Sequence, residues 1–259
     1  MANMIREAFN TLIHEPLYNS LVFLIDVVPY ADVGIAVILL TIFVKLILFP
    51  LSLKAVRTQI ALRAMEPELK ELKLKHKDNQ HAQALAMMEL YRKYEVNPFS
   101  SILLIFIQLP IIFGLYWVFY KGGLPVLSPE HLYTFVPLPE VINMQFLGLV
   151  DVASTRNILF TLLVGITQFI QIRLTLPPLA ARTENPSFQE DFTRSMHLNM
   201  RYVLPVVVTV AAYFLSVAIA LYWITSNIFA IGQEFYVKYR IKKPADAVLP
   251  ENIIASQKK

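Results

Sequence analysis

The chain has no cysteine, few glycines and few charged residues, and each shortage removes a class of function. Without cysteine there is no disulfide framework, thiolate metal site, cysteine nucleophile or lipid-modified cysteine. Seven glycines in 259 residues argue against a glycine-rich loop that cradles a nucleotide. Charged residues make up 16% of the chain, against about 25% in soluble domains. With 56% hydrophobic residues, the composition is typical of an integral membrane protein.

Enzyme signatures are also missing from the sequence. There is no G-x-S-x-G, P-loop or H-E-x-x-H motif, and the five histidines lie outside the apolar runs without metal-ligand spacing. We therefore expect a protein that is not an enzyme and that holds no metal or other cofactor.

Apolar runs long enough to cross a bilayer recur along the chain. About 20 apolar residues, roughly 30 Å of helix, span the hydrocarbon core. Val33–Leu53 is apolar except for Lys45, Phe99–Tyr120 has no charge, and Asn157–Ile172 has arginine on both sides. Tyr202–Gln233 has 32 uncharged residues, which is long for one span and short for two.

The distribution of basic residues indicates how many times the last apolar run crosses the membrane. Cytoplasmic segments of membrane proteins are enriched in Lys and Arg. Residues 54–97 carry nine of them and the tail after Tyr239 carries five, whereas residues 122–155 carry none. Five spans, with the N-terminus outside, place both basic segments in the cytoplasm, whereas four would place the tail outside. We therefore predict two spans in the last run, divided near Leu215–Ala218.

Two segments outside the spans have amphipathic patterns. Residues 1–31 repeat apolar side chains at helical spacing among polar ones, which predicts an interfacial helix. Residues 54–97 do the same on either side of a turn at Lys77–Asn79, which predicts a cytoplasmic helical hairpin. A plain charged loop is the alternative for the second segment.

The predicted fold class is therefore an all-α integral membrane protein of a bacterial-type plasma membrane. It has five transmembrane helices, a cytoplasmic helical hairpin and an N-terminal interfacial amphipathic helix. The predicted segments are 1–31 (extracytoplasmic interfacial helix), 32–53 (span one), 54–97 (hairpin), 98–121 (span two), 122–155 (extracytoplasmic loop), 156–176 (span three), 177–198 (cytoplasmic loop), 199–215 (span four), 217–238 (span five) and 239–259 (basic cytoplasmic tail).

Lys45 is a charge placed inside the first predicted span. A lysine at a helix centre costs about 2.5–3.5 kcal/mol on insertion scales, so such a residue usually faces a partner or a wet cavity. The other predicted spans contain no acid except Glu234, near the end of the last. We expect a hydrated, positively charged cavity within the bilayer. The alternative is that Lys45 extends along its helix to the interface.

Uncharged polar residues in four spans favour the cavity. Each of them alone could make an ordinary interhelical hydrogen bond. Together they indicate a shared wet lining, with Tyr222 beside it, formed by Thr41, Gln108, Thr167, Gln168, Gln171, Ser226 and Asn227.

Three ordered motifs resemble the YidC/Oxa/Alb family of membrane protein insertases, and the match covers nearly the whole chain from about Glu15. The first is TIFVKLILFPL, residues 41–51, with a positive residue shortly before Pro-Leu. The second is YRKYEVNP, residues 91–98, followed by Gln108-Leu-Pro, and the third is LYWITSN, residues 221–227.

The resemblance implies five core helices around a groove that is open to the cytoplasm and to lipid but closed to the outside. Its positive residue, here Lys45 next to Thr41, would attract the acidic part of an incoming chain. Tyr222 and Trp223 would contact that chain. The family most often has arginine at the position of Lys45, and lysine is a more compact charge.

The implied function is insertion and folding of newly made membrane proteins, without a nucleotide cofactor. The implied partners are nascent membrane proteins and membrane lipid, with the ribosome and the Sec translocon as further candidates, and no DNA. Two other functions stay open on the sequence alone. One is a channel or small-solute transporter that uses the same cavity, and the other is a scaffold for membrane assembly.

Overall fold

The computed structural model describes residues 2–76, 79–94, 110–119, 124–127, 129–176 and 188–240. Most of this part of the chain is helical, which confirms the prediction of a mainly α-helical protein. Ile158–Thr175 is long and apolar enough to cross a membrane, and Val33–Ile47 with Phe49–Thr58 meets the same criterion as one broken span. Pro110–Phe119 is a shorter apolar helix.

The chain forms two compact units, one from residues 1–47 and 108–232 and the other from residues 48–107 and 233–259. Each unit is described separately below. The first unit contains α1 (Ala2–Phe9), α2 (Glu15–Val27), α3 (Val33–Ile47), the Pro110–Phe119 helix, β1 (Gln145–Phe146), β2 (Val150–Asp151), α8 (Ile158–Thr175), α9 (Phe188–Leu198), α10 (Leu204–Phe214) and most of α11 (Val217–Arg240). The second contains α4 (Phe49–Ala64), α5 (Glu66–Lys75), α6 (Gln80–Lys93) and the end of α11.

Polar side chains mark where several helices begin. The side chain of Asn157 accepts a hydrogen bond from the amide of Phe160 at the start of α8, and Asn79 does the same for Ala82 at the start of α6. Such caps satisfy amides that have no partner within the helix. Pro50 stands in the first turn of α4, where the lack of an N–H is tolerated, and the preceding helix has ended at Ile47.

The core of the first unit is formed by apolar side chains from α2, α3, the Pro110–Phe119 helix, α8 and α11. In α2, one face is fully buried through Tyr18, Leu21, Val22 and Ile25. The amphipathic pattern of this N-terminal segment therefore packs one helix face against the rest of the unit.

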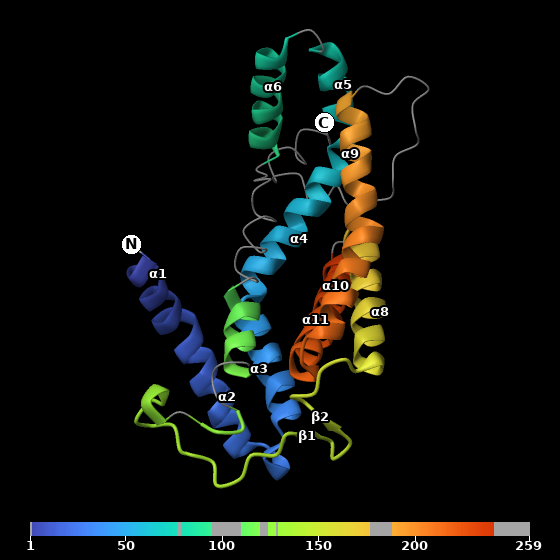
Figure 1. The fold of residues 1–259 in the computed structure, drawn as a ribbon. Helices are drawn as coiled ribbons and strands as arrows, with labels where there is room; N and C mark the ends of the chain where they lie inside the picture. The colour runs from blue at the N-terminus through green and yellow to red at the C-terminus, as the bar shows by residue number, and fades with distance from the viewer. Residues whose placement is uncertain are drawn as a thin grey trace. The chain divides into compact units, whose positions relative to one another are not determined.

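Helices α8 and α10 run side by side in the first unit (Figure 1). Their contact is close at Gly165, where an added Cβ would lie 2.5 Å from the hydroxyl oxygen of Thr209. Small residues permit this approach of two helices in membranes. The faces turned away expose rows of large apolar side chains, as lipid contact requires: Ile158, Leu159, Leu162 and Ile166 on α8, and Leu204, Val206, Val207, Val210 and Phe214 on α10.

The predicted loop 122–155 contains a small antiparallel sheet. Gln145 pairs with Asp151 and Phe146 with Val150. The turn between them uses left-handed backbone at Leu147 (φ 52°) and Gly148 (φ 70°). Four residues in two strands give no alternating pattern long enough to be recognised in a sequence.

In the second unit, α4 is joined to the end of α11. The Gln233 amide nitrogen donates to the Ser52 hydroxyl oxygen over 2.9 Å, and the rings of Phe49 and Tyr236 are 6.1 Å apart. Glu234 is buried within this unit, next in sequence to Gln233.

Candidate functional site

Lys45 lies in the last turn of α3 and continues a stripe of buried residues spaced four apart. Val37 is fully buried, Thr41 is 2% exposed and Lys45 is half-buried. Phe43 and Leu46, on the other side of the helix, are exposed. The lysine stem therefore follows the face of α3 that packs in the core, one turn after Thr41.

The position of Lys45 in its helix favours a positive charge. The last four carbonyl groups of a helix have no amide partner within it, and they carry the negative end of the helix dipole. Helix α3 ends at Ile47, so these carbonyls surround the turn that contains Lys45. A cation at such a position gains typically 0.3–1 kcal/mol near a surface. The break after Ile47 thus lowers the cost of keeping this lysine charged.

The hydroxyl groups of Thr41 and Thr167 both donate a hydrogen bond to a carbonyl group of their own helix. The Thr41 hydroxyl donates to the carbonyl of Val37 over 2.7 Å, and the Thr167 hydroxyl reaches the carbonyl of Leu163 over 2.8 Å. This back-bonding satisfies the donor within an apolar helix. Each hydroxyl then offers only lone pairs to a neighbour, which makes both residues acceptors for donors on other chains or helices.

Asn227 of α11 uses the acceptor that Thr167 presents. Its amide nitrogen donates to the Thr167 hydroxyl oxygen over 3.2 Å, and its side chain is buried. The structure thereby joins two of the predicted polar residues, from α8 and α11, that are 60 positions apart in the chain.

Tyr222 and Ser226 lie one turn apart on α11 and are 2% and 5% exposed. The Tyr222 hydroxyl interacts with that of Ser226, and neither hydroxyl has a further hydrogen-bond partner among the described residues. A buried hydroxyl that lacks a full set of partners is costly, so the two groups are placed together on one face of α11.

Three of the other predicted site residues lie on the same two helices, Gln168 and Gln171 on α8 and Trp223 on α11. Gln171 of α8 donates to the hydroxyl of Thr175 one turn later over 3.2 Å, and Gln168 is half-buried. Trp223 is half-buried and packs against the core of the first unit. Gln108 lies outside the described residues.

Residues 24–244 match the family model described as 60Kd inner membrane protein. The chain belongs to this family. It is the YidC/Oxa/Alb family that the three sequence motifs indicated, and the resemblance is therefore confirmed.

Individual relatives of this YidC/Oxa/Alb member carry the name membrane protein insertase YidC. The protein of Ectopseudomonas mendocina strain ymp is 31% identical over 83% of this chain and 32% of its own length. That of Alkalilimnicola ehrlichii is 30% identical over 88% of this chain and 35% of its own length. That of Azotobacter vinelandii is 29% identical over 82% of this chain. The chain spans about a third of the length of these curated relatives.

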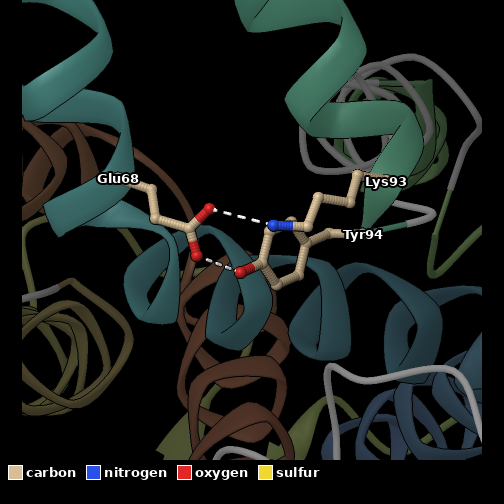
Figure 2. Close-up of polar contacts among 3 residues, drawn as sticks. All are labelled: Glu68, Lys93 and Tyr94. Carbon is tan, nitrogen blue, oxygen red and sulfur yellow. Dashed lines mark hydrogen bonds and ion pairs between the residues drawn. The ribbon is translucent and has the colours of Figure 1, made fainter. Parts of the chain in front are cut away.

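In this family member, α5 and α6 of the second unit pack as neighbours and are joined at one end by three side chains (Figure 2). The Tyr94 hydroxyl donates to the Glu68 carboxylate, and Lys93 forms an ion pair with the same carboxylate over 3.4 Å. The Lys93 ammonium also lies 5.1 Å from the centre of the Tyr94 ring. The hydrogen bond to Glu68, with burial, raises the pKa of Tyr94 to about 12. We call this cluster of Glu68, Lys93 and Tyr94 the hairpin latch.

The sequence reasoning missed two buried polar residues of the first unit, Asn19 and Asp32. Asp32 precedes the apolar run of α3, a position typical of a helix cap, so that part of its role could have been recognised. Asn19 lies within α2 and had no such signal. Both bind segments more than 100 residues further along the chain.

Proposed function

We propose that this chain inserts newly made membrane proteins into a membrane and helps them fold. Membership of the YidC/Oxa/Alb family supports this function, because the relatives that match are named membrane protein insertases. The observation that carries the mechanism is the position of Lys45 at the end of the buried stripe of α3, one turn after Thr41.

The mechanism follows from the cost of moving polar groups through hydrocarbon. A polar segment loses its water on the way, and each unsatisfied group costs several kcal/mol. A hydrated groove open to the cytoplasm shortens the dry path, and Lys45 attracts acidic segments most strongly where water is scarce. Thr41, Thr167, Gln168, Gln171, Ser226 and Asn227, with Gln108, line this groove and offer hydrogen bonds, while Tyr222 and Trp223 contact the incoming chain.

The energy for the step comes from the substrate itself. Burying an apolar transmembrane helix releases about 25 cal/mol for each Å² of apolar surface removed from water. No nucleotide and no bond chemistry are needed, so the protein acts as an insertase and chaperone rather than as an enzyme. The exposed apolar faces of α8 and α10 offer the lipid contact beside which a substrate helix can settle.

The proposed topology has five spans, with the N-terminus outside and the C-terminus in the cytoplasm of a bacterial-type cell. It places both basic segments, 54–97 and 239–259, on the cytoplasmic side. There the hairpin and the basic tail can meet a nascent chain, the ribosome or the Sec translocon. The tail beyond Arg240 lies outside the described residues.

The test is insertion of a small membrane protein into liposomes that contain the purified chain. We expect Lys45→Arg to retain insertion of a substrate with an acidic translocated tail, and Lys45→Ala and Lys45→Glu to reduce it by about tenfold, which corresponds to 1.4 kcal/mol. Lys54→Ala removes the same charge from an exposed position on α4 and serves as the matched control.

Two further results bear on the mechanism. A neutral substrate tail should make insertion insensitive to the charge at position 45. Full insertion of the acidic substrate by both Lys45→Ala and Lys45→Glu would rule out charge attraction.

Because the chain has no cysteine, a single cysteine at Thr41 or Trp223 can be crosslinked to a nascent chain. A scaffold that never takes substrate at this site would give no such crosslink.

A further inference from the structure

The π-helical segment Asn199–Val203 brings an arginine to the end of α8. This segment lies between α9 and α10 and packs against α8 in the first unit. The guanidinium of Arg201 donates a hydrogen bond over 3.4 Å to the carbonyl of Leu176, the residue that follows the last turn of α8. The side chain of Arg201 is therefore held at the end of α8, where helix carbonyls have no amide partner within the helix.

Arg173, in the last turn of α8, lies between two contacts of α8 with this segment. One is the bond from Arg201 to Leu176, three residues after Arg173. The other is the contact of the Phe169 ring, four residues before Arg173, with the Tyr202 ring, whose centre is 6.4 Å away. Residues three and four apart are neighbours on a helix surface, so Arg173 and Arg201 lie at the same end of the helix pair. Arg173 is exposed, and Tyr202 is 51% exposed.

The two stretches of sequence that meet at this end carry positive charge only. Residues 152–183 and 192–233 contain no Asp or Glu. The dipole of α8 places roughly half of a negative elementary charge at this helix end, which offsets less than one guanidinium. A bound anion would therefore lower the energy of two arginines placed here. The guanidinium fork matches the oxygens of a phosphate group in particular.

Exposed apolar rows lead away from the two arginines along α8 and α10, which run side by side (Figure 1). Both rows have a spacing of four residues, and they end at Arg173 on one helix and at Tyr202 on the other: Leu162, Ile166 and Ile170 on α8, and Phe214, Val210 and Val206 on α10. From Leu162 to Ile170 the helix rises about 12 Å, and half of the hydrocarbon core is roughly 15 Å thick. Rows of this length fit the acyl chains of a lipid, whereas a soluble anion would make no use of them.

We propose that Arg173, Arg201 and the hydroxyl of Tyr202 bind the phosphate of an anionic phospholipid, whose acyl chains lie along the two apolar rows. In the proposed topology this end of α8 is cytoplasmic, on the side where membranes carry a negative surface potential. The assignment of the leaflet rests on the proposed topology, whereas the binding itself needs no substrate.

Lipid binding to the full chain in dodecyl maltoside micelles tests the site, with mass spectrometry of the intact complex to count bound lipids. We expect phosphatidylglycerol to bind at least fivefold more tightly than phosphatidylcholine with the same acyl chains. Arg173→Gln and Arg201→Gln should each weaken the binding of phosphatidylglycerol by about fivefold, the effect of one basic residue at a membrane surface. Arg92→Gln removes the same charge from an exposed position of α6 and should leave the binding unchanged.

Two results of this experiment would overturn the site. Arg173 is exposed, so its replacement should not disturb folding, and an unchanged affinity in Arg173→Gln would exclude its role. Glycerol phosphate has the headgroup charge without acyl chains and should not displace the lipid. Displacement by glycerol phosphate or by a soluble acidic peptide would show a site for soluble anions instead.

A dye on a single cysteine locates the lipid in liposomes, since the chain has no cysteine of its own. At Ile170→Cys, phosphatidylglycerol with a nitroxide on its acyl chain should quench the dye at about fivefold lower content than labelled phosphatidylcholine. Arg173→Gln should abolish this preference. Ile158→Cys, at the opposite end of α8, is the matched control and should show none.

Equal quenching of the dye at position 170 by both lipids would contradict the proposal. Disulfide-linked dimers through this cysteine, without a lipid preference, would show that a second copy covers this face and would also contradict it. The result is independent of insertion. If the unchanged protein inserts no substrate while the lipid preference holds, the proposed function fails and the lipid site stands.

Discussion

Asn227 donates a hydrogen bond to the hydroxyl oxygen of Thr167, which links α11 to α8 over 3.2 Å. Because the Thr167 hydroxyl gives its own hydrogen to the carbonyl of Leu163, it can accept from Asn227 but has no hydrogen left to donate to it. The pair is therefore directional, and only a donor at position 227 can satisfy it.

Replacing Asn227 with Asp should accordingly destabilise the protein more than replacing it with Leu. A carboxylate would face the lone pairs of Thr167 and bring a charge into a buried position in place of a neutral donor. For the neutral pair, a double-mutant cycle with Asn227→Leu and Thr167→Val should give a coupling free energy of about 0.6 kcal/mol, as for other interhelical bonds in membranes. Unfolding in mixed micelles measures the stability of the Asp and Leu variants and the coupling free energy. A coupling free energy of zero would show that the hydrogen bond contributes nothing to stability.

The hairpin latch should open at high pH. The pKa of Tyr94 is raised to about 12 from the ordinary value of 10, so its stabilising contribution is complete below pH 10 and is lost as the pH rises toward 12. Absorbance of tyrosinate at 295 nm measures this ionisation, as the difference between the unchanged protein and Tyr94→Phe. Glu68→Gln should move the transition back toward pH 10, because the largest cause of the shift is the bond to Glu68. A transition near 10 in the unchanged protein would contradict the latch.

Two helix glycines should respond in opposite ways to replacement by alanine. In Gly165→Ala the new methyl group would collide with Thr209 on α10, which we expect to cost about 1–3 kcal/mol. Around Gly232 nothing lies within 4 Å of an added Cβ, so Gly232→Ala should stabilise α11 by roughly 0.5–1 kcal/mol. Thermal melting compares the two variants. Thr209→Ala should rescue Gly165→Ala and should leave the effect of Gly232→Ala unchanged.

The contact between α2 and residues 129–133 should weaken in acid. Burial lowers the pKa of His14, and His131, whose ring centre is 6.2 Å away, lowers it further, while Glu15 acts in the opposite direction. Neutral His14 thus stabilises the folded state above its ordinary pKa of 6.5, and this stabilisation is lost as the pH falls through the lowered value. In the same contact, Asn19 accepts a hydrogen bond from the amide of Tyr133 over 2.7 Å.

The contact between α2 and residues 129–133 can be measured by hydrogen exchange of the Tyr133 amide. The exchange rate is corrected for its intrinsic pH dependence. The protection of this amide should fall as the pH is lowered from 7 through the lowered pKa of His14 in the unchanged protein. It should vary less in His14→Gln, whereas His81→Gln, on the exposed face of α6, should behave like the unchanged protein. Constant protection over this pH range would contradict the assignment.

Local sequence signals were enough to predict most of the helical structure. Long apolar runs predicted that α8 and α3 would be helices. The caps at Asn157 and Asn79 were not predicted, although both residues are of a type that is preferred at the start of a helix. Charge distribution divided the last run near Leu215–Ala218, and α10 ends at Phe214 while α11 begins at Val217.

Contacts between distant segments could not be predicted in this way. Thr167 and Asn227 were both recognised as polar residues in apolar spans, but no local signal shows that they are partners. The cap role of Asp32 is local, whereas its bond to Leu147 crosses 115 positions. Residues 143–156 were predicted only as part of a loop. Their bonds to the ends of α3, α10 and α11 come from main-chain atoms, which are the same for every residue.

The main-chain bonds of residues 143–156 limit how this segment can change in evolution. Amides and carbonyls survive almost any substitution, so most side chains of residues 143–156 are free to drift. An insertion or deletion shifts every later amide out of register with α10 and α11. Among relatives, selection should therefore conserve the length of this segment more strictly than its sequence, with Asp32 retained as an acid.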